Sequence, residues 1–153
     1  MKLDSIDRQL LRILQSDARI SNLELAERVN LSPTPCARRV KRFEDEGLIK
    51  GTTTLLDPEM LGLTLTAYIA VSMQKHTDDV FEAFEARVVE FPEVIGCSVI
   101  TGRNEDYLLK VVVRNMKHYE EFLLTRLNSL PGVNNVHTSF ELRNVTPAKG
   151  LPV

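Results

Sequence analysis

Three stretches within the first 47 residues carry apolar side chains at the three- and four-residue spacing of an amphipathic α-helix. The first helix is expected after Asp4, at about residues 5–15, the second after Ser21, and the third after Ser32. Their apolar stripes consist of Ile6, Leu10, Ile13 and Leu14, then of Leu23, Ala26 and Val29, and finally of Cys36, Val40 and Phe43. The pattern predicts a small three-helix domain, in which the first helix supports the other two.

The second and third helices are joined by a tight turn, and their ends carry matching signals. Ser21 is a suitable N-cap, with Glu24 three residues later to complete a capping box. Asn30 tolerates the positive φ of a turn residue, and Ser32 can cap the third helix. Gly47 suits the position that follows a helix C-terminus. The pair is therefore predicted to be a helix-turn-helix.

From Leu65 onward the apolar pattern has period two, which is typical of half-buried β-strands. Strands are expected at residues 65–73, 94–101, 107–114 and 133–143, with one helix that ends before Pro92 and another that ends before Pro131. The segment Phe91-Pro92-Glu93-Val94 recurs 39 residues later as Leu130-Pro131-Gly132-Val133. This half of the chain is therefore predicted to consist of two βαβ units.

Two βαβ units in one sheet give a ferredoxin-like βαββαβ fold, with both helices on the same face of the sheet. The opposite face would stay uncovered, and its residues are expected to include Tyr68, Ala70, Val112 and Phe140, or their alternates. An uncovered and partly apolar face of this size is expected to bind a partner.

The segment between the two halves, Lys50–Leu56, is rich in Thr and apolar residues and is expected to be a linker strand. The predicted fold class is α+β. The predicted parts are a helix-turn-helix domain at residues 1–50, a linker at 51–63 and a ferredoxin-like domain at 64–153. The last stretch, residues 144–153, contains two Pro and one Gly and is expected to be a loose arm.

Charge is distributed unevenly between these parts. The net charge of the 153 residues is −2, which by itself argues against a polyanionic partner. Residues 1–50, however, contain ten Lys and Arg against eight Asp and Glu, whereas the remainder is acidic. Four of the five residues from Arg38 to Arg42 are cationic. This asymmetry indicates a small DNA-binding module attached to a module of another kind.

The third helix can be interpreted in two ways. It could be an ordinary charged helix, although such helices usually interleave both signs, and this one does so only from Glu44 onward. Alternatively, Thr34, Arg38 and Arg42 form a face opposite the apolar stripe that enters the major groove of DNA. On position along the helix, Thr34 and Arg38 are expected to contact bases, and Lys41 and Arg42 phosphates.

The run Leu31–Ile49, LSPTPCARRVKRFEDEGLI, resembles the helix-turn-helix of the Lrp/AsnC (feast/famine) family of transcriptional regulators, and the resemblance extends over nearly the whole chain. It is close to the leucine-responsive branch in the DNA-binding half and looser in the C-terminal half. It implies binding to double-stranded DNA through Ser32, Thr34, Pro35, Arg38, Arg39, Lys41 and Arg42. It also implies that the linker pairs with that of a second subunit and that dimers assemble into tetramers or octamers. A two-fold dimer is expected to bind inverted-repeat operators.

The loop at residues 101–107 could be a plain hairpin turn. The resemblance instead implies an amino-acid effector site between dimers, because the family has a Gly and an Asp-Tyr pair here; in this chain three residues rather than two separate Gly102 from Asp106. Asp106 could accept hydrogen bonds from the effector's ammonium group, and N–H groups near Gly102 could bind its carboxylate. The effector is expected to be small and aliphatic, such as leucine or methionine. The implied effector-binding residues are Thr101, Gly102, Asp106, Tyr107, His137, Thr138 and Ser139.

Signals for catalysis are missing from the sequence. It contains no Gly-rich phosphate loop, no G-x-S-x-G motif and no His and Cys at metal-binding spacing. Glu105 and Asp106 are adjacent on a strand end, so their carboxylates would point to opposite faces. Neither a catalytic residue, a metal nor a cofactor is therefore expected. The alternative to a regulator is a ferredoxin-like sensor or enzyme that does not bind DNA. Such a protein would not need the cluster of cations from Arg38 to Arg42.

Cellular location is the last inference from the sequence. No apolar run approaches the length of a membrane span, and the N-terminus has no apolar signal region. Cys36 and Cys97 lie within apolar patterns and are expected to be buried thiols of a reducing compartment rather than a disulfide. A cytoplasmic protein without a membrane partner is expected.

Overall fold

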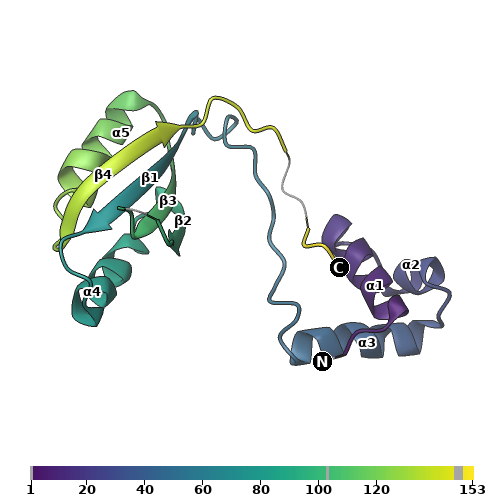
Figure 1. Cartoon of the computed structure of the whole chain (residues 1–153). Coiled ribbons are helices and arrows are strands. Elements are labelled where there is room, and N and C mark those ends of the chain that lie inside the picture. Colours follow the sequence, from purple (N-terminus) through teal and green to yellow (C-terminus); the bar gives the residue numbers. More distant parts are fainter. Residues whose placement is uncertain (1, 103, 147–149) are drawn as a thin grey trace. The chain divides into compact units, whose positions relative to one another are not determined.

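The computed structural model describes residues 2–102, 104–146 and 150–153. The chain forms two compact units (Figure 1). The first comprises Met1–Leu55 together with Val145–Val153, and the second comprises Leu56–Asn144. The grouping of Val145–Val153 with the N-terminal helices differs from the prediction that residues 64–153 form one domain.

The first unit contains the three expected helices, α1 (Ser5–Ser16), α2 (Asn22–Arg28) and α3 (Pro33–Asp45). Their apolar stripes meet in one small core, except that Leu23 was expected there and is 60% exposed, while Leu25 is buried in its place. The buried members of that core are Leu10, Leu11, Leu25, Ala26, Val29, Cys36 and Phe43. The helical spacing in the sequence therefore identified both the helices and most of the residues that join them.

The helix ends agree with the sequence signals except at two points. The predicted capping box of α2 is half formed, because only the Ser21 side chain takes part in it. The backbone of Asn30 has φ 55° and that of Gly47 has φ 71°, as the two turns require. The Ser21 hydroxyl accepts a hydrogen bond from the N–H of Glu24 at 3.2 Å. The Ser32 side chain, in contrast, makes no capping hydrogen bond, although Ser32 occupies the N-cap position of α3. Pro33 lacks an N–H in any case, so α3 begins with one fewer donor to satisfy.

The second unit has the expected βαββαβ order. Its elements are β1 (Leu65–Met73), α4 (Asp78–Val88), β2 (Val94–Val99), β3 (Tyr107–Val113), α5 (Met116–Phe122) with a π-helical turn (Leu123–Leu127), and β4 (Val133–Phe140). The strands form one antiparallel sheet in the order β2-β3-β1-β4. This is the ferredoxin-like fold predicted from the internal repeat.

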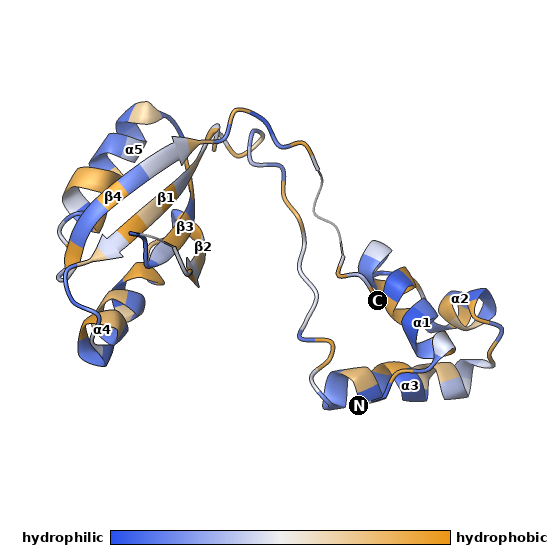
Figure 2. Ribbon diagram, in the orientation of Figure 1, coloured by the Kyte–Doolittle hydropathy of each residue, from blue (hydrophilic) through white to orange (hydrophobic). Residues whose placement is uncertain are grey.

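One face of the sheet packs on the two helices. Every second residue of β1, from Leu65 to Met73, is apolar, and Figure 2 shows both apolar and polar segments along β1 and β4. In β1 the odd-numbered residues from Ala67 to Met73 are buried against α4 and α5. Phe140 also lies on this face, where its ring is 5.0 Å from that of Tyr119, so its expected place on the uncovered face was wrong. The register explains the difference, because Phe140 pairs with the core residue Ala67.

The opposite face of the sheet carries a polar cluster among smaller apolar residues. The Tyr68 hydroxyl donates to the Glu141 carboxylate at 2.9 Å. Lys110 lies 3.8 Å from the same carboxylate and 5.4 Å from the centre of the Tyr68 ring. Tyr68 is therefore on the uncovered face, as expected.

Two further expectations differ from the structure. Lys50–Leu56 was expected to be a strand but has no regular secondary structure. A strand requires the N–H and C=O groups of a neighbouring strand, and nothing in the described part of this single chain supplies them. Cys97 is exposed on the edge strand β2, whereas Cys36 is buried as expected.

No helix in the described residues has the length and hydropathy that crossing a membrane would need.

Candidate nucleic-acid interface and ligand pocket

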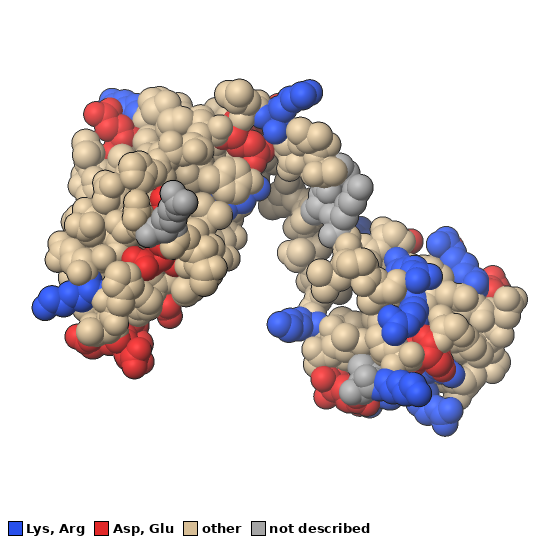
Figure 3. Space-filling model, in the orientation of Figure 1, with Lys and Arg blue, Asp and Glu red and all other residues tan. Residues whose placement is uncertain are grey.

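The exposed face of α3 carries three of the predicted DNA-binding residues. Thr34, Arg38 and Lys41 are spaced three and four residues apart, so they lie on one side of the helix, and all three are exposed. Ser32 is exposed at the N-terminus of the helix, and Pro35 is half-buried. Within the described part of the chain, neither Arg38 nor Lys41 forms an ion pair. Figure 3 shows Lys and Arg side chains gathered over the helices of this unit.

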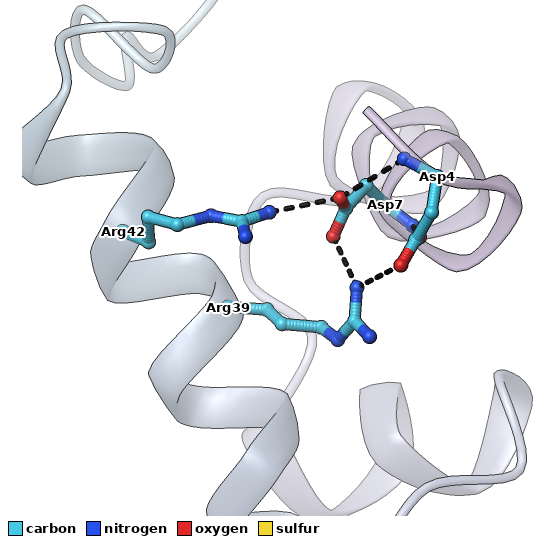
Figure 4. Close-up of polar contacts among 4 residues, drawn as sticks. All are labelled: Asp4, Asp7, Arg39 and Arg42. Atoms are coloured by element: carbon cyan, nitrogen blue, oxygen red, sulfur yellow. Dashed lines mark hydrogen bonds and ion pairs between the residues drawn. The ribbon is translucent and has the colours of Figure 1, made fainter. Parts of the chain in front are cut away.

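Arg39 and Arg42 have a different environment, because both point from α3 to the start of α1 (Figure 4). Arg39 Nη1 lies 2.6 Å from Asp4 Oδ2 and 2.6 Å from Asp7 Oδ1. Arg42 Nη2 lies 2.8 Å from Asp7 Oδ2. The predicted position of Arg42, opposite the apolar stripe, was therefore wrong. These two cations connect α3 to α1.

Asp7 is the centre of this ion-pair network. It is only 1% exposed, and both of its carboxylate oxygens are bound by guanidinium groups. It also forms a capping box with Asp4: the Asp7 N–H donates to Asp4 Oδ1 at 2.7 Å, and the Asp4 N–H donates to Asp7 Oδ2 at 3.2 Å. The same carboxylate thus starts α1 and fixes α3 against it.

The network sets the pKa values of its acids. Burial alone would raise the pKa of Asp7, but hydrogen bonds from Arg39, from the Asp4 N–H and from Arg42 outweigh burial and lower it below its ordinary value. The Asp7 N–H, followed by Arg39, lowers the pKa of Asp4. The two carboxylates raise the pKa of Arg39 in return. All these groups are therefore charged at neutral pH.

Sequence reasoning missed the role of Asp7, although a signal was present. Arg39 follows the buried Cys36 by three residues, which places it about 60° from the apolar stripe rather than opposite it. A cation so close to the core needs a nearby acid. The acids at the start of α1 were interpreted only as helix-starting residues.

A pocket of about 460 Å³ lies in the second unit, where the end of β1, the loop before β3 and the start of β4 meet. Three of the predicted effector-binding residues line it, namely Gly102, Asp106 and His137. The other lining residues are Ser72, Met73, His76, Asn104, Glu105, Asn134 and Asn135. The topology therefore brings together the loop and the last strand, as expected for a binding site.

Asp106 supplies a negative charge to this pocket, but its carboxylate already has partners. Its side chain is 16% exposed. One oxygen accepts the N–H of Met73 at 2.7 Å, and the other lies 2.8 Å from His76 Nε2. A carboxylate has about four lone-pair sites, so Asp106 can still accept from a further donor.

Four of the predicted effector-binding residues do not line the pocket. Tyr107 is fully buried and donates to Glu85 Oε1 at 2.8 Å, and burial followed by this bond raises its pKa. Thr138 also faces the helices, with its hydroxyl 2.6 Å from that of Tyr119. Thr101 is exposed in the loop, and Ser139 pairs with Tyr68 in the sheet. The alternation Tyr107, Leu109, Val111 and Val113 in β3 was the available signal that Tyr107 belongs to the core.

The structure gives no sign of a metal centre in its described residues, where no group of three or more His, Cys, Asp or Glu side chains could hold an ion.

Comparison with known proteins connects both units to one family. The model of the Lrp/AsnC ligand binding domain matches residues 66–151. A model of winged helix-turn-helix DNA-binding domains matches residues 3–50.

Curated relatives match the chain over almost its full length. The DNA-binding transcriptional activator DecR of Escherichia coli K12 is 44% identical over 99% of both chains. The leucine-responsive regulatory protein of the same organism is 42% identical and covers 99% of this chain and 92% of its own. A transcriptional regulator of Neisseria meningitidis, crystallised as its complex with L-Met, is 41% identical. It superposes with a TM-score of 0.94 over 99% of this chain and 97% of its own. The chain therefore belongs to the Lrp/AsnC family and is a DNA-binding transcriptional regulator, not an enzyme.

Proposed function

We propose that this regulator senses a small aliphatic amino acid, such as methionine or leucine, in the Asp106 pocket. The observation that carries the proposal is the pocket itself, in which Gly102 and Asp106 of the loop before β3 meet His137 of β4. The relative crystallised with L-Met and the relative named for its response to leucine support the choice of effector.

The chemistry of the pocket fits an α-amino acid. The Asp106 carboxylate is only slightly exposed and can accept hydrogen bonds from an ammonium group, and bonds to a charged donor are stronger than neutral ones. We propose that backbone N–H groups near Gly102 bind the effector's carboxylate. Met73 also lines the pocket, where its backbone N–H binds Asp106, while its side chain is buried in the core.

DNA recognition is assigned to the exposed face of α3. Thr34 and Arg38 lie toward the N-terminal part of the helix, which usually contacts base edges, whereas Lys41 lies further along and suits a phosphate. Arg39 and Arg42 hold the helix in place through Asp7. The proposal thus divides the cations into two that meet DNA and two that position the helix.

The operator is proposed to be an inverted repeat bound by an oligomer of dimers. The uncovered face of the sheet, which carries Tyr68, Lys110 and Glu141, is the proposed contact between two copies. A two-fold dimer presents two copies of α3, so it matches two half-sites related by the same symmetry. Light scattering at micromolar concentration should show a dimer or a multiple of it, and a monomer would contradict this proposal.

Calorimetric titration with a panel of amino acids tests the effector assignment. Asp106→Asn keeps an acceptor for the Met73 N–H but removes the charge, so it should bind the effector at least about tenfold more weakly. Asp78→Asn, at an exposed position of α4, is the matched control and should bind like the wild type. If the wild type binds none of the amino acids, the effector proposal fails. If Asp106→Asn binds as tightly as the wild type, the site lies elsewhere.

A further inference from the structure

The end of the chain returns to the first unit. After β4 the chain leaves the second unit, and Val145–Val153 belong to the same compact unit as the three helices. Figure 1 shows the C-terminus beside α1. The two units are therefore joined by two covalent connections, one between β1 and the helices and one through the tail. Neither family resemblance nor the local sequence pattern had indicated this second connection.

The docked segment, residues 150–153, is held by two side chains of α1. The Gln15 amide binds both backbone groups of Leu151: its Nε2 donates to the Leu151 oxygen at 3.0 Å, and its Oε1 accepts the Leu151 N–H. Arg12 Nε donates to the Val153 oxygen at 2.7 Å. Arg12 and Gln15 are three residues apart and thus neighbours on one face of the helix. Gln15 acts toward Leu151 as a neighbouring strand would.

Packing supports the same docking. Val153 is half-buried against the core of the three helices. Together with Leu151 it lines a groove of about 1030 Å³, whose walls include Leu11, Leu14 and Ile20. Gly150 lies so close to α1 that an added Cβ would be 2.8 Å from the Cβ of Gln15, so a larger residue there would push the segment away.

We propose that residues 150–153 are a docking strap that limits the freedom of the DNA-binding helices relative to the ligand-binding unit. The strap follows β4 in the sequence, and β4 carries the pocket residue His137. Because the strap is covalently attached, its effective concentration at α1 is high even though each contact is weak. A few exposed hydrogen bonds and one half-buried Val can also be released without unfolding either unit.

Hydrogen exchange in the full-length protein tests the docking directly. Pro152 has no amide, so a C-terminal peptide that covers residues 150–153 reports on Leu151 and Val153. In the wild type the Leu151 amide should exchange more slowly than in an unstructured peptide. Gln15→Ala and Gly150→Val should each remove that protection. Gln9→Ala, an exposed glutamine on the same helix, is the matched control and should retain it. Unprotected exchange in the wild type, or equal protection in Gln15→Ala, would overturn the strap.

The functional consequence rests on the proposed binding of inverted repeats. Affinity is measured for an operator with its natural half-site spacing and for one with half a helical turn inserted. The spacing ratio is the first affinity divided by the second. Releasing the strap by Gln15→Ala should lower the ratio of the two affinities by about three- to tenfold, because freer helices tolerate the altered spacing better. Gln9→Ala should leave the ratio unchanged. An unchanged ratio in Gln15→Ala would show that the strap does not constrain the helices.

A disulfide that holds the strap on α1 should have the opposite effect to releasing the strap. Gln15→Cys with Gly150→Cys, in a Cys97→Ser background, places two Cβ atoms close enough for a bridge after a small adjustment. Oxidation should form this bridge within one chain and raise the spacing ratio above that of the reduced protein. Gln9→Cys with Gly150→Cys should not form a bridge. Bridge formation at equal yield in both pairs would contradict a specific docking site. If the wild type binds neither operator, the proposed function is contradicted. The hydrogen-exchange test of strap docking is not affected by that outcome.

Discussion

A single buried carboxylate explains why the cations of α3 are not equivalent. Asp7 is 1% exposed and binds Arg39 and Arg42, so these two side chains are used inside the protein. Arg38 immediately precedes Arg39, and Lys41 immediately precedes Arg42, yet the side chains of Arg38 and Lys41 are exposed. At the scale of the residue, the side of α3 that faces Asp7 determines which cations are paired within the unit.

Replacing Asp7 should therefore destabilise the first unit. Asp7→Asn leaves the capping geometry largely possible but removes the charge between two guanidinium groups. Because Arg39 and Arg42 are partly exposed and can rehydrate, the expected loss is about 2–4 kcal/mol, at or below the usual cost of breaking a buried pair. Urea unfolding measures it. Glu27→Gln, exposed on α2, should change stability by less than about 0.5 kcal/mol. A loss in Asp7→Asn as small as in this control would show that the network does not stabilise the unit.

The Asp7 carboxylate should also make the free energy of unfolding depend on pH. The pKa of Asp7 in the folded state lies below its ordinary value of 3.8, so the unfolded state binds a proton more readily than the folded state. The stabilisation is therefore complete above about pH 4 to 5 and is lost as the pH falls through the lowered pKa. Unfolding followed from pH 7 to pH 3 should show a steeper loss for wild type than for Asp7→Asn. Parallel curves would contradict the assignment.

At the scale of the element, sequence patterns predicted the helices and strands but not the features that depend on a neighbouring strand. The helices of the first unit and the strand order of the second follow from periodicity and from the repeat of Phe91–Val94 at Leu130–Val133. Lys50–Leu56 has the composition of a strand, but strand formation depends on a neighbour that composition cannot supply. Phe140 was placed on the wrong face because the register of β4, not its composition, decides the facing.

The turn before β4 allows the packing of this turn against α4 to be tested. Gly132 has φ 85°, and a Cβ there would lie 2.5 Å from Val80 Cγ1 of α4. Gly132→Ala should therefore cost about 2–4 kcal/mol, the sum of backbone strain and overpacking. Gly62 also has a positive φ, of 71°, but an open environment, so Gly62→Ala should cost only about 1 kcal/mol. Equal losses in urea unfolding would show that the contact with Val80 does not matter.

At the scale of the whole molecule, the charge asymmetry of the sequence corresponds to a division of labour. The unit with α3 carries the excess of cations, and the acidic unit carries the Asp106 pocket. Periodicity could not predict that residues 150–153 lie on α1, because Gln15 and Leu151 are 136 positions apart and neither has a distinctive local signal. The family resemblance implied Tyr107 for the pocket, although the apolar alternation of β3 already indicated a buried side chain, and its hydroxyl binds Glu85 of α4.

The division of the α3 cations is tested most directly by comparing Arg38→Ala, Lys41→Ala and wild type on a selected operator and on unrelated DNA. Arg38→Ala should lose about 1–3 kcal/mol on the operator and little on unrelated DNA, because a base contact is lost. Lys41→Ala should weaken both complexes about equally and lower the dependence of binding on salt concentration. If both variants lost operator and unrelated DNA in the same proportion, the exposed face of α3 would not read sequence as we describe.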